Sequence, residues 1–233
     1  MVEKNLWIKL FPVYCLVFIL GIVIVRMCSN TVTVLVEHSP MDKRSCIAID
    51  AGHGGIDGGA VSLSGIPESQ INLQIAERLN DLLHLMGYQT HMLRNSDTSL
   101  HTEGATISAQ KISDLKHRVS IVQEINASLL ISIHQNTFSN SRYRGAQVFY
   151  SSDGESISVA RSLQENFILI LNPDSKRAAK PAKGIYLMEH ASCPSLLVEC
   201  GFLTNPQEEA LLRDANYQKQ LCSVIAATVS ARK

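Results

Sequence analysis

The chain of 233 residues has no excess of either charge, because 21 basic side chains balance 21 acidic ones. Nucleic acid and anionic lipid headgroups usually require a clear excess of lysine and arginine, so the composition predicts neither as a partner of the folded domain. The six cysteines form no C-x-x-C pair, which argues against a zinc ribbon, a thioredoxin-like redox motif and a dense disulfide scaffold. The sequence also lacks internal repeats and low-complexity tracts. Its hydrophobic content of 45% is ample for a folded core.

An apolar segment near the N-terminus is distinct from the rest of the chain. Residues 10–25 are uncharged and mostly apolar, and Lys9 and Arg26 flank them. As a helix they would span about 24 Å, short of the roughly 30 Å hydrocarbon core, but Lys9 can extend to the headgroups and Trp7 can lie at the interface. Pro12 argues against a buried core helix. No small-x-small cleavage site follows, which favours an uncleaved membrane anchor over a cleaved signal sequence.

We therefore predict a signal or anchor segment at residues 1–28, a linker at 29–45 and one folded domain at 46–233. Two lysines precede the apolar segment and one arginine follows it, which favours a cytoplasmic N-terminus and a domain outside the cytoplasm, either membrane-anchored or secreted.

From Cys46 onward, short apolar runs alternate with segments of helical periodicity, a pattern typical of an α/β sheet with helices on its faces. The stretch 95–110 is predicted to be a polar loop. Strands are predicted at residues 46–50, 88–93, 128–134, 145–150, 185–188 and 196–200. Helices are predicted from apolar faces that include Ile71, Ile75 and Leu79, then Ile112, Leu115 and Val119, then Val159, Leu163 and Phe167, and finally Leu221, Val224 and Ile225.

Four polar side chains follow the predicted strands. His53 lies three residues past the first strand, while His134 and Glu199 stand at or near the ends of two others. Glu68 lies in the first turn of the helix after the first strand, in register with its buried face, so it should face the sheet edge. Because ligands gather beyond the carboxyl ends of parallel strands, these four side chains should converge at one edge.

Each of these residues also has a simpler interpretation. A single histidine at a strand end is more often a hydrogen-bonded structural residue, and Glu68 could merely complement the helix dipole. Glu199 is harder to explain in this way, because an ionised carboxylate within an apolar run needs a partner or a raised pKa. Five glycines at residues 52–59 permit close backbone approach to a ligand, but neither G-x-x-x-x-G-K nor G-x-G-x-x-G is present, so a phosphate loop is disfavoured.

Two histidines and a glutamate are the ligands of many hydrolytic zinc sites, which leave the fourth position to water. The facial triad of non-haem iron oxygenases has the same ligand types. Its first histidine and its carboxylate are normally two residues apart, whereas His53 and Glu68 are fifteen apart, so zinc is preferred. Asp50 and Asp57 are candidates either to orient a histidine ring or to stabilise the turn. Arg118 is predicted to be structural, paired with Asp114 or Asp97.

Four stretches of the sequence resemble the zinc-dependent N-acetylmuramoyl-L-alanine amidase family, the amidase type 3 group. The resemblance extends over about 185 residues, from Cys46 to Ser230. The matching stretches are IDAGHGG at residues 49–55, Glu68 with its helix, ISIHQN at residues 131–136, and LVECGFLTNP at residues 197–206.

The resemblance implies that His53, Glu68 and His134 bind Zn²⁺ and that Glu199 is the catalytic carboxylate. It also implies a three-layer α/β domain, with a twisted, mostly parallel six-stranded sheet between helices. The implied reaction cleaves the amide that joins the lactyl group of N-acetylmuramic acid to L-alanine of the stem peptide. The implied partners are peptidoglycan glycan strands and stem peptides.

Within the family, the short length, the N-terminal segment and the stretch 184–188 are most similar to the germination-specific amidases of spore formers. That similarity implies a role in cortex maturation, through muramic lactam formation, and in germination, on the forespore or cell-wall side of the membrane. A regulatory protein partner is a further hypothesis.

Asn136, just past His134, is a candidate substrate contact. Arg177 and Lys183 belong to a basic stretch that either meets carboxylates of the stem peptide or is a solvated loop. Two rival functions remain: another zinc peptidase or deacetylase acting on wall polymers, and a non-catalytic wall-binding protein. The intact ligand set and Glu199 argue against the second rival, because a binding protein has no need of a general base beside a metal.

Overall fold

The computed structural model describes residues 45–232. The predicted anchor at residues 1–28, and the predicted linker except its last residue, lie outside them. Among the described residues, no helix combines the length and the apolar character needed to cross a membrane.

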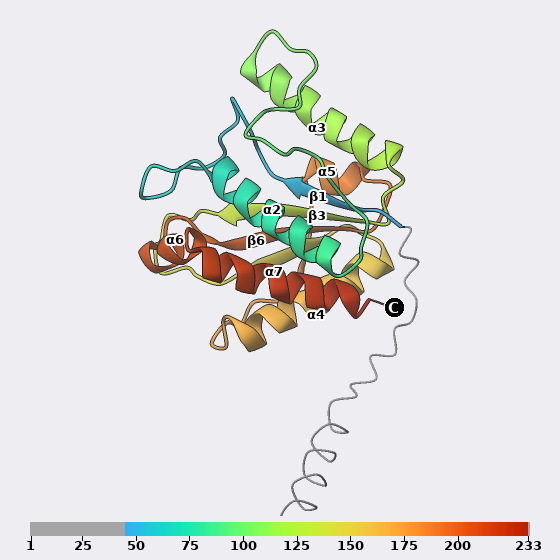
Figure 1. The fold of residues 1–233 in the computed structure, drawn as a ribbon. Coiled ribbons are helices and arrows are strands. Elements are labelled where there is room, and N and C mark those ends of the chain that lie inside the picture. Colours follow the sequence, from blue (N-terminus) through green and yellow to red (C-terminus); the bar gives the residue numbers. More distant parts are fainter. Residues whose placement is uncertain (1–44, 233) are drawn as a thin grey trace, which may run out of the picture. The chain divides into compact units, whose positions relative to one another are not determined.

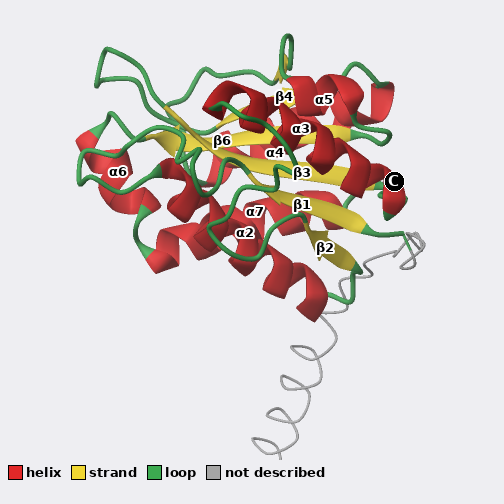
Figure 2. Cartoon of the chain, turned by 90° about the horizontal axis from the view of Figure 1, so that it is seen from above, coloured by secondary structure: helices red, strands yellow, loops and turns green. Residues whose placement is uncertain are grey.

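A six-stranded sheet lies between two layers of helices in the described part of the chain (Figures 1 and 2). The strands are β1 (Ile47–Ala51), β2 (Thr90–Met92), β3 (Leu129–Asn136), β4 (Gln147–Tyr150), β5 (Lys180–Pro181) and β6 (Ser195–Phe202). The helices are α2 (Glu68–Leu85), α3 (Ile107–Glu124), α4 (Gly154–Ile170), α5 (Tyr186–His190), α6 (Pro206–Leu212) and α7 (Ala215–Ser230).

The strands are ordered β2-β1-β3-β6-β4-β5 across the sheet. Every neighbouring pair is parallel except β4 and β6, so the sheet is mixed but mostly parallel. This confirms the predicted α/β class and the six-stranded sheet. Because β1, β3 and β6 are adjacent and parallel, their carboxyl ends lie together at one edge, where ligands bind in open α/β sheets.

The central strands are buried on both faces, which explains why their sequences read as continuous apolar runs. Alternate residues point to opposite faces of the sheet. Ile49, Ile131 and Val198 share one core with residues of α2, α4 and α7, and Leu130 and Leu197 share the other with residues of α3 and α5. Figure 1 shows these two helical layers on either side of the sheet.

Two local predictions were wrong. Residues 185–188 were expected to be a strand, but they lie in or beside helix α5, and Leu187 and Met188 are buried in the core shared with α3. The sheet edge beside β4 is instead occupied by the short polar strand β5. Helix α3 begins at Ile107, inside the expected polar loop, because the side chain of Thr106 accepts a hydrogen bond from the Ala109 N–H and caps the helix.

Helix α6 had not been predicted. Asn205 caps it by accepting hydrogen bonds from the N–H groups of Gln207 and Glu208, and Pro206 occupies its first turn.

Candidate active site

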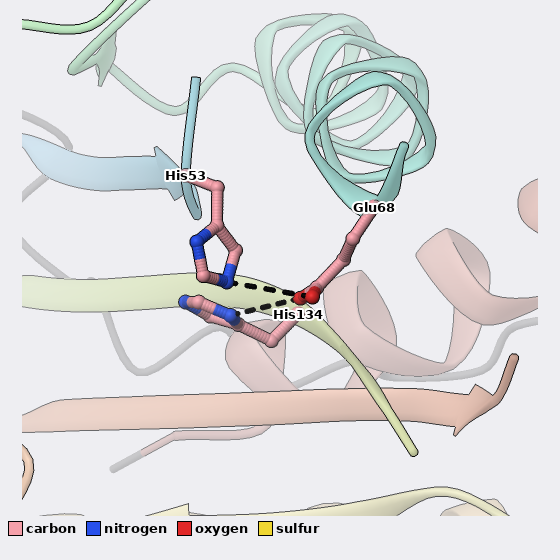
Figure 3. Close-up of side chains that lie close together, drawn as sticks. All are labelled: His53, Glu68 and His134. Carbon is pink, nitrogen blue, oxygen red and sulfur yellow. Dashed lines mark hydrogen bonds and ion pairs between the residues drawn. The ribbon is translucent and has the colours of Figure 1, made fainter. Parts of the chain in front are cut away.

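Three candidate ligands meet at the carboxyl edge of the sheet. His53 lies in the turn after β1, Glu68 is the first residue of α2, and His134 lies near the end of β3. Figure 3 shows the three side chains pointing toward one another. The Nε2 atom of His53 lies 3.4 Å from Oε2 of Glu68, and Nδ1 of His134 lies 3.1 Å from Oε1 of the same carboxylate. One ligand atom from each residue lies within 4.8 Å of the others, so the three can share one cation.

Two glycines make this close approach possible. A Cβ atom at Gly52 would lie 2.2 Å from Nε2 of His134. A Cβ atom at Gly59 would lie 2.7 Å from both Oε2 of Glu68 and Cδ2 of His53, and the φ angle of Gly59 is 69°. The backbone of the glycine-rich turn therefore lies close against the three candidate ligands, which agrees with the close backbone approach that the glycines suggested.

The backbone of His53 adopts a conformation that is rare for a residue with a side chain. Its φ angle is 62°, and strain of this kind persists only where the surroundings hold it. Arg118 donates a hydrogen bond from Nη2 to the His53 carbonyl at 2.7 Å. Arg94 donates to the carbonyls of Ala51 at 2.7 Å and Gly52 at 3.0 Å. Two buried guanidinium groups therefore fix the chain segment that presents the His53 ring.

Arg118 is structural, as predicted, but its partners differ in part from the expected ones. It pairs with Asp114, which was expected, and with Asp50 rather than Asp97. Arg94 was missed by the sequence analysis, because a single arginine after a strand carries no distinguishing pattern.

Glu68 is buried and surrounded by donors. Its carboxylate accepts hydrogen bonds from the backbone N–H groups of Ala60 and Gln135, both at 3.0 Å, and from the Asn72 side chain at 3.3 Å. Burial raises the pKa of Glu68, but the hydrogen bonds and charges of His134 and His53 outweigh it and hold the pKa well below its ordinary value. Glu68 is therefore an ionised carboxylate held in a fixed orientation.

His53 has a second carboxylate neighbour. Its Nδ1 atom lies 3.0 Å from Oδ2 of Asp57, and Oδ1 of Asp57 lies 2.8 Å from Nζ of Lys111 on α3. Burial lowers the pKa of His53, but Glu68 and Asp57 outweigh it and raise the pKa to about 9. Of the two predicted ring-orienting aspartates, Asp57 contacts a ring. Asp50 instead binds Arg118 and accepts a hydrogen bond from Ser132.

Glu199 stands beside this cluster and forms no hydrogen bond or ion pair with its three residues. It faces His134 in the ladder between β3 and β6. Its Oε2 atom is buried and has no hydrogen-bond partner among the described residues. Burial raises the pKa of Glu199 to about 7, with the charge of Glu68 adding to the increase and those of His134 and His53 opposing it. A half-buried carboxyl group whose Oε2 atom is buried and unpartnered, next to a candidate metal site, is suited to accept and release protons.

The predicted substrate contacts lie in different places. Asn136 ends β3 and is half-buried. Arg177 lines a cavity of about 820 Å³, whereas Lys183 lines a separate cavity of about 280 Å³ beside α5. The basic stretch that contains both residues is therefore divided between two cavities.

The fold and the site together define an α/β domain with a candidate metal centre, and a carboxyl group beside it, at the carboxyl edge of its sheet. Residues 47–231 match the family model of the N-acetylmuramoyl-L-alanine amidases, and the chain belongs to this family. It is therefore an enzyme of peptidoglycan breakdown, as its motifs predicted.

Similar proteins include members with a specialised role. The chain is 40% identical over 181 residues to the germination-specific N-acetylmuramoyl-L-alanine amidase of Bacillus subtilis, covering 77% of this chain and 76% of that protein. It is 28% identical over 227 residues to the amidase AmiA of Escherichia coli, covering 78% and 74%. The solved structure of the CwlD amidase from Clostridioides difficile, in complex with the GerS lipoprotein, superposes with a TM-score of 0.77 at 36% identity, covering 81% of this chain and 98% of that one. The predicted resemblance to germination-specific amidases is confirmed.

Proposed function

We propose that the chain is a zinc-dependent amidase that releases stem peptides from N-acetylmuramic acid in the spore cortex. The observation that carries this proposal is the convergence of His53, Glu68 and His134 within 4.8 Å, with the unpartnered Oε2 of Glu199 on the adjacent strand.

The donor set fits zinc. Two imidazole nitrogens and one carboxylate oxygen are common protein ligands of a catalytic zinc ion, which keeps a further position for water or substrate. Gly52 and Gly59 leave no room for side chains against the three ligands, so the pocket is shaped around them. Asp57, which accepts a hydrogen bond at Nδ1 of His53, leaves Nε2 of that ring directed at Glu68.

Zinc, when bound, would lower the pKa of a water molecule toward roughly 7 and polarise the scissile carbonyl. Glu199 would accept the proton of the attacking water and deliver it to the departing nitrogen of L-alanine. Burial raises the pKa of Glu199 to about 7 in the metal-free chain, and the charge of a bound cation would oppose that rise, so the group is suited both to accept and to release a proton. Asn136 at the end of β3, Arg177 in the larger cavity and Lys183 in the smaller one would contact the substrate.

The proposed cortex role is supported by the 40% identity to a germination-specific amidase. The enzyme would act outside the cytoplasm, held to the forespore membrane by residues 1–28. The complex of the similar CwlD amidase with a lipoprotein supports a regulatory protein partner for this chain as well.

Metal content and product analysis of the purified full-length chain test the proposal together. One zinc ion per chain is expected, and digested peptidoglycan should yield stem peptides with a free L-alanine amino terminus. Cleavage within the stem would indicate a peptidase, a glucosamine-type amine with the stem still attached would indicate a deacetylase, and an undigested sample would indicate a binding protein. In a disruption strain the cortex should lack muramic acid stripped of peptide, and an unchanged cortex would contradict the spore role.

A further inference from the structure

A large cavity lies beside β4, which pairs with the strand β6 that carries Glu199. It has a volume of about 820 Å³ and lies between the start of β4, residues 171–178 and α6. Arg177 projects along its wall, half-buried, and donates hydrogen bonds to the Arg144 carbonyl at 3.0 Å and to Oε1 of Gln147 at 3.3 Å. No carboxylate of the described residues lies within ion-pairing distance of this guanidinium group. A partly desolvated cation with only neutral acceptors is suited to bind an anion.

Most of the other charged side chains that line the cavity are also basic. Lys176 and Lys180 line it, are exposed, and make no ion pair within the described part of the chain. Of the two acids in the wall, Asp174 pairs with Arg144 at 3.7 Å. The other, Glu208, accepts hydrogen bonds from the backbone N–H groups of Gly145 and Phe202, at 2.7 and 2.9 Å. Neither acid forms an ion pair with Arg177, and the basic side chains that line the cavity outnumber these two acids.

The cavity begins one strand away from Glu199. Gln147, the hydrogen-bond partner of Arg177, directly faces Glu199 in the antiparallel ladder between β4 and β6. Neighbouring strands lie about 4.8 Å apart, and the guanidinium carbon of Arg177 lies 4.8 Å from the centre of the Phe202 ring, on the same strand as Glu199. Two extended residues of a peptide span about 7 Å. A peptide whose first amide lies at Glu199 would extend toward Arg177 with the side chain or carboxyl group of its second residue.

This inference rests on the proposed function and specifies its substrate. We propose that the cavity is a subsite for a free carboxylate of the stem peptide, with Arg177 as its anchor, and that the enzyme discriminates against stem peptides whose carboxylates are amidated. The side chains of Lys176 and Lys180 raise the positive potential and make no ion pair within the described residues. The planar guanidinium group of Arg177 can bind the carboxylate through two parallel hydrogen bonds.

Two probes that differ only at the carboxylates test the subsite. They are N-acetylmuramyl-L-alanyl-D-glutamate and its diamide, hydrolysed by the full-length, metal-loaded chain. We expect KM for the diamide to be about tenfold higher, as for a lost charge-assisted hydrogen bond. Arg177→Gln should raise KM for the acidic probe more than KM for the diamide, so that the preference for the acidic probe is lost. The matched control Arg161→Gln, which removes an exposed arginine from α4, should keep the preference.

Binding of the released peptide separates the two proposals. In calorimetry, L-alanyl-D-glutamate should bind at least about tenfold more tightly than its diamide, and this measurement does not depend on cleavage of the muramyl amide. Because Arg177 also supports the cavity wall, the Lys176→Gln/Lys180→Gln double variant provides a second test and should weaken binding of the acidic peptide alone. Equal affinity for both peptides in the wild-type chain, or an undiminished difference in both variants, would overturn the subsite. Absence of muramyl amide cleavage with the binding difference intact would instead refute the proposed function.

Discussion

The backbone of Gly52 lies directly against the ring of His134, so that a Cβ atom at this position would come within 2.2 Å of Nε2. The φ angle of Gly52 is not in the left-handed region, so alanine fits the backbone but not the space. In Gly52→Ala the His134 ring must therefore shift from the position in which its Nδ1 atom faces Glu68. We expect kcat/KM to fall about 100-fold, as for a catalytic group displaced by about 1 Å, while the melting temperature changes little.

Gly154→Ala is the matched control, because a Cβ atom there contacts nothing within 4 Å. Zinc content and thermal unfolding of both variants check the result. Full activity in Gly52→Ala would show that the position of the His134 ring is not critical.

Glu199→Gln keeps the shape of the side chain but removes its ability to accept a proton. We expect a loss of about 100- to 10,000-fold in kcat, the usual contribution of general acid–base catalysis, with zinc content unchanged. Glu165→Gln, at an exposed position of α4, serves as the control for the charge change. An active Glu199→Gln enzyme would refute the catalytic assignment.

Asp57→Asn tests how the His53 ring is oriented. The 3.0 Å contact between Nδ1 of His53 and the Asp57 carboxylate fixes the ring, and partners of this kind typically contribute 10- to 100-fold to metal affinity. We expect zinc binding to weaken by about that factor in a competition assay with a chelator. Asp81→Asn, on the exposed side of α2, should bind zinc like the wild type; equal loss in both variants would show that charge, and not orientation, matters.

The buried pair of Asp50 and Arg118 predicts how stability depends on pH. Burial raises the pKa of Asp50, but Arg118 and Ser132 outweigh it and lower the pKa below its ordinary 3.8. The stabilisation is therefore complete above the unfolded-state pKa of about 3.9 and is lost as the pH falls through the lower folded-state value. Asp50→Asn should cost about 3 kcal/mol at neutral pH, because it removes a buried partner of the guanidinium group.

Urea denaturation between pH 3 and pH 7 measures both effects. The free energy of unfolding of the wild type should decline more steeply at the acid end than that of Asp50→Asn. Parallel curves for the two proteins would show that Asp50 does not contribute to the acid sensitivity.

Local sequence patterns were sufficient to place the candidate site. His53, His134 and Glu199 each follow or end a strongly apolar strand, and Glu68 stands in register with the buried face of its helix. Those features depend only on short-range periodicity and on the rule that parallel strands share a carboxyl edge. The convergence of these side chains at one edge of the sheet was therefore predictable from the sequence.

Other features depend on contacts between distant segments. Residues 185–188 form an apolar run too short to distinguish a strand from a helical turn, and their state is decided by burial of Leu187 and Met188 against the core shared with α3. Arg94 is linked to the turn at His53 only through backbone carbonyls, which leave no trace in the sequence. By contrast, Asn205 and Pro206 are a recognisable helix start, and helix α6 could have been predicted from them.

The reversed direction of β4 has a consequence for engineering. Because β3 ends at Asn136 and β4 returns from Gln147, both ends of residues 137–146 lie at the edge that carries the candidate ligands. Doubling the length of such a connection costs only about 0.6 kcal/mol. New recognition loops grafted there would reshape the entrance to the site while every strand keeps its neighbours, which makes this segment the preferred place to redirect the enzyme toward other wall polymers.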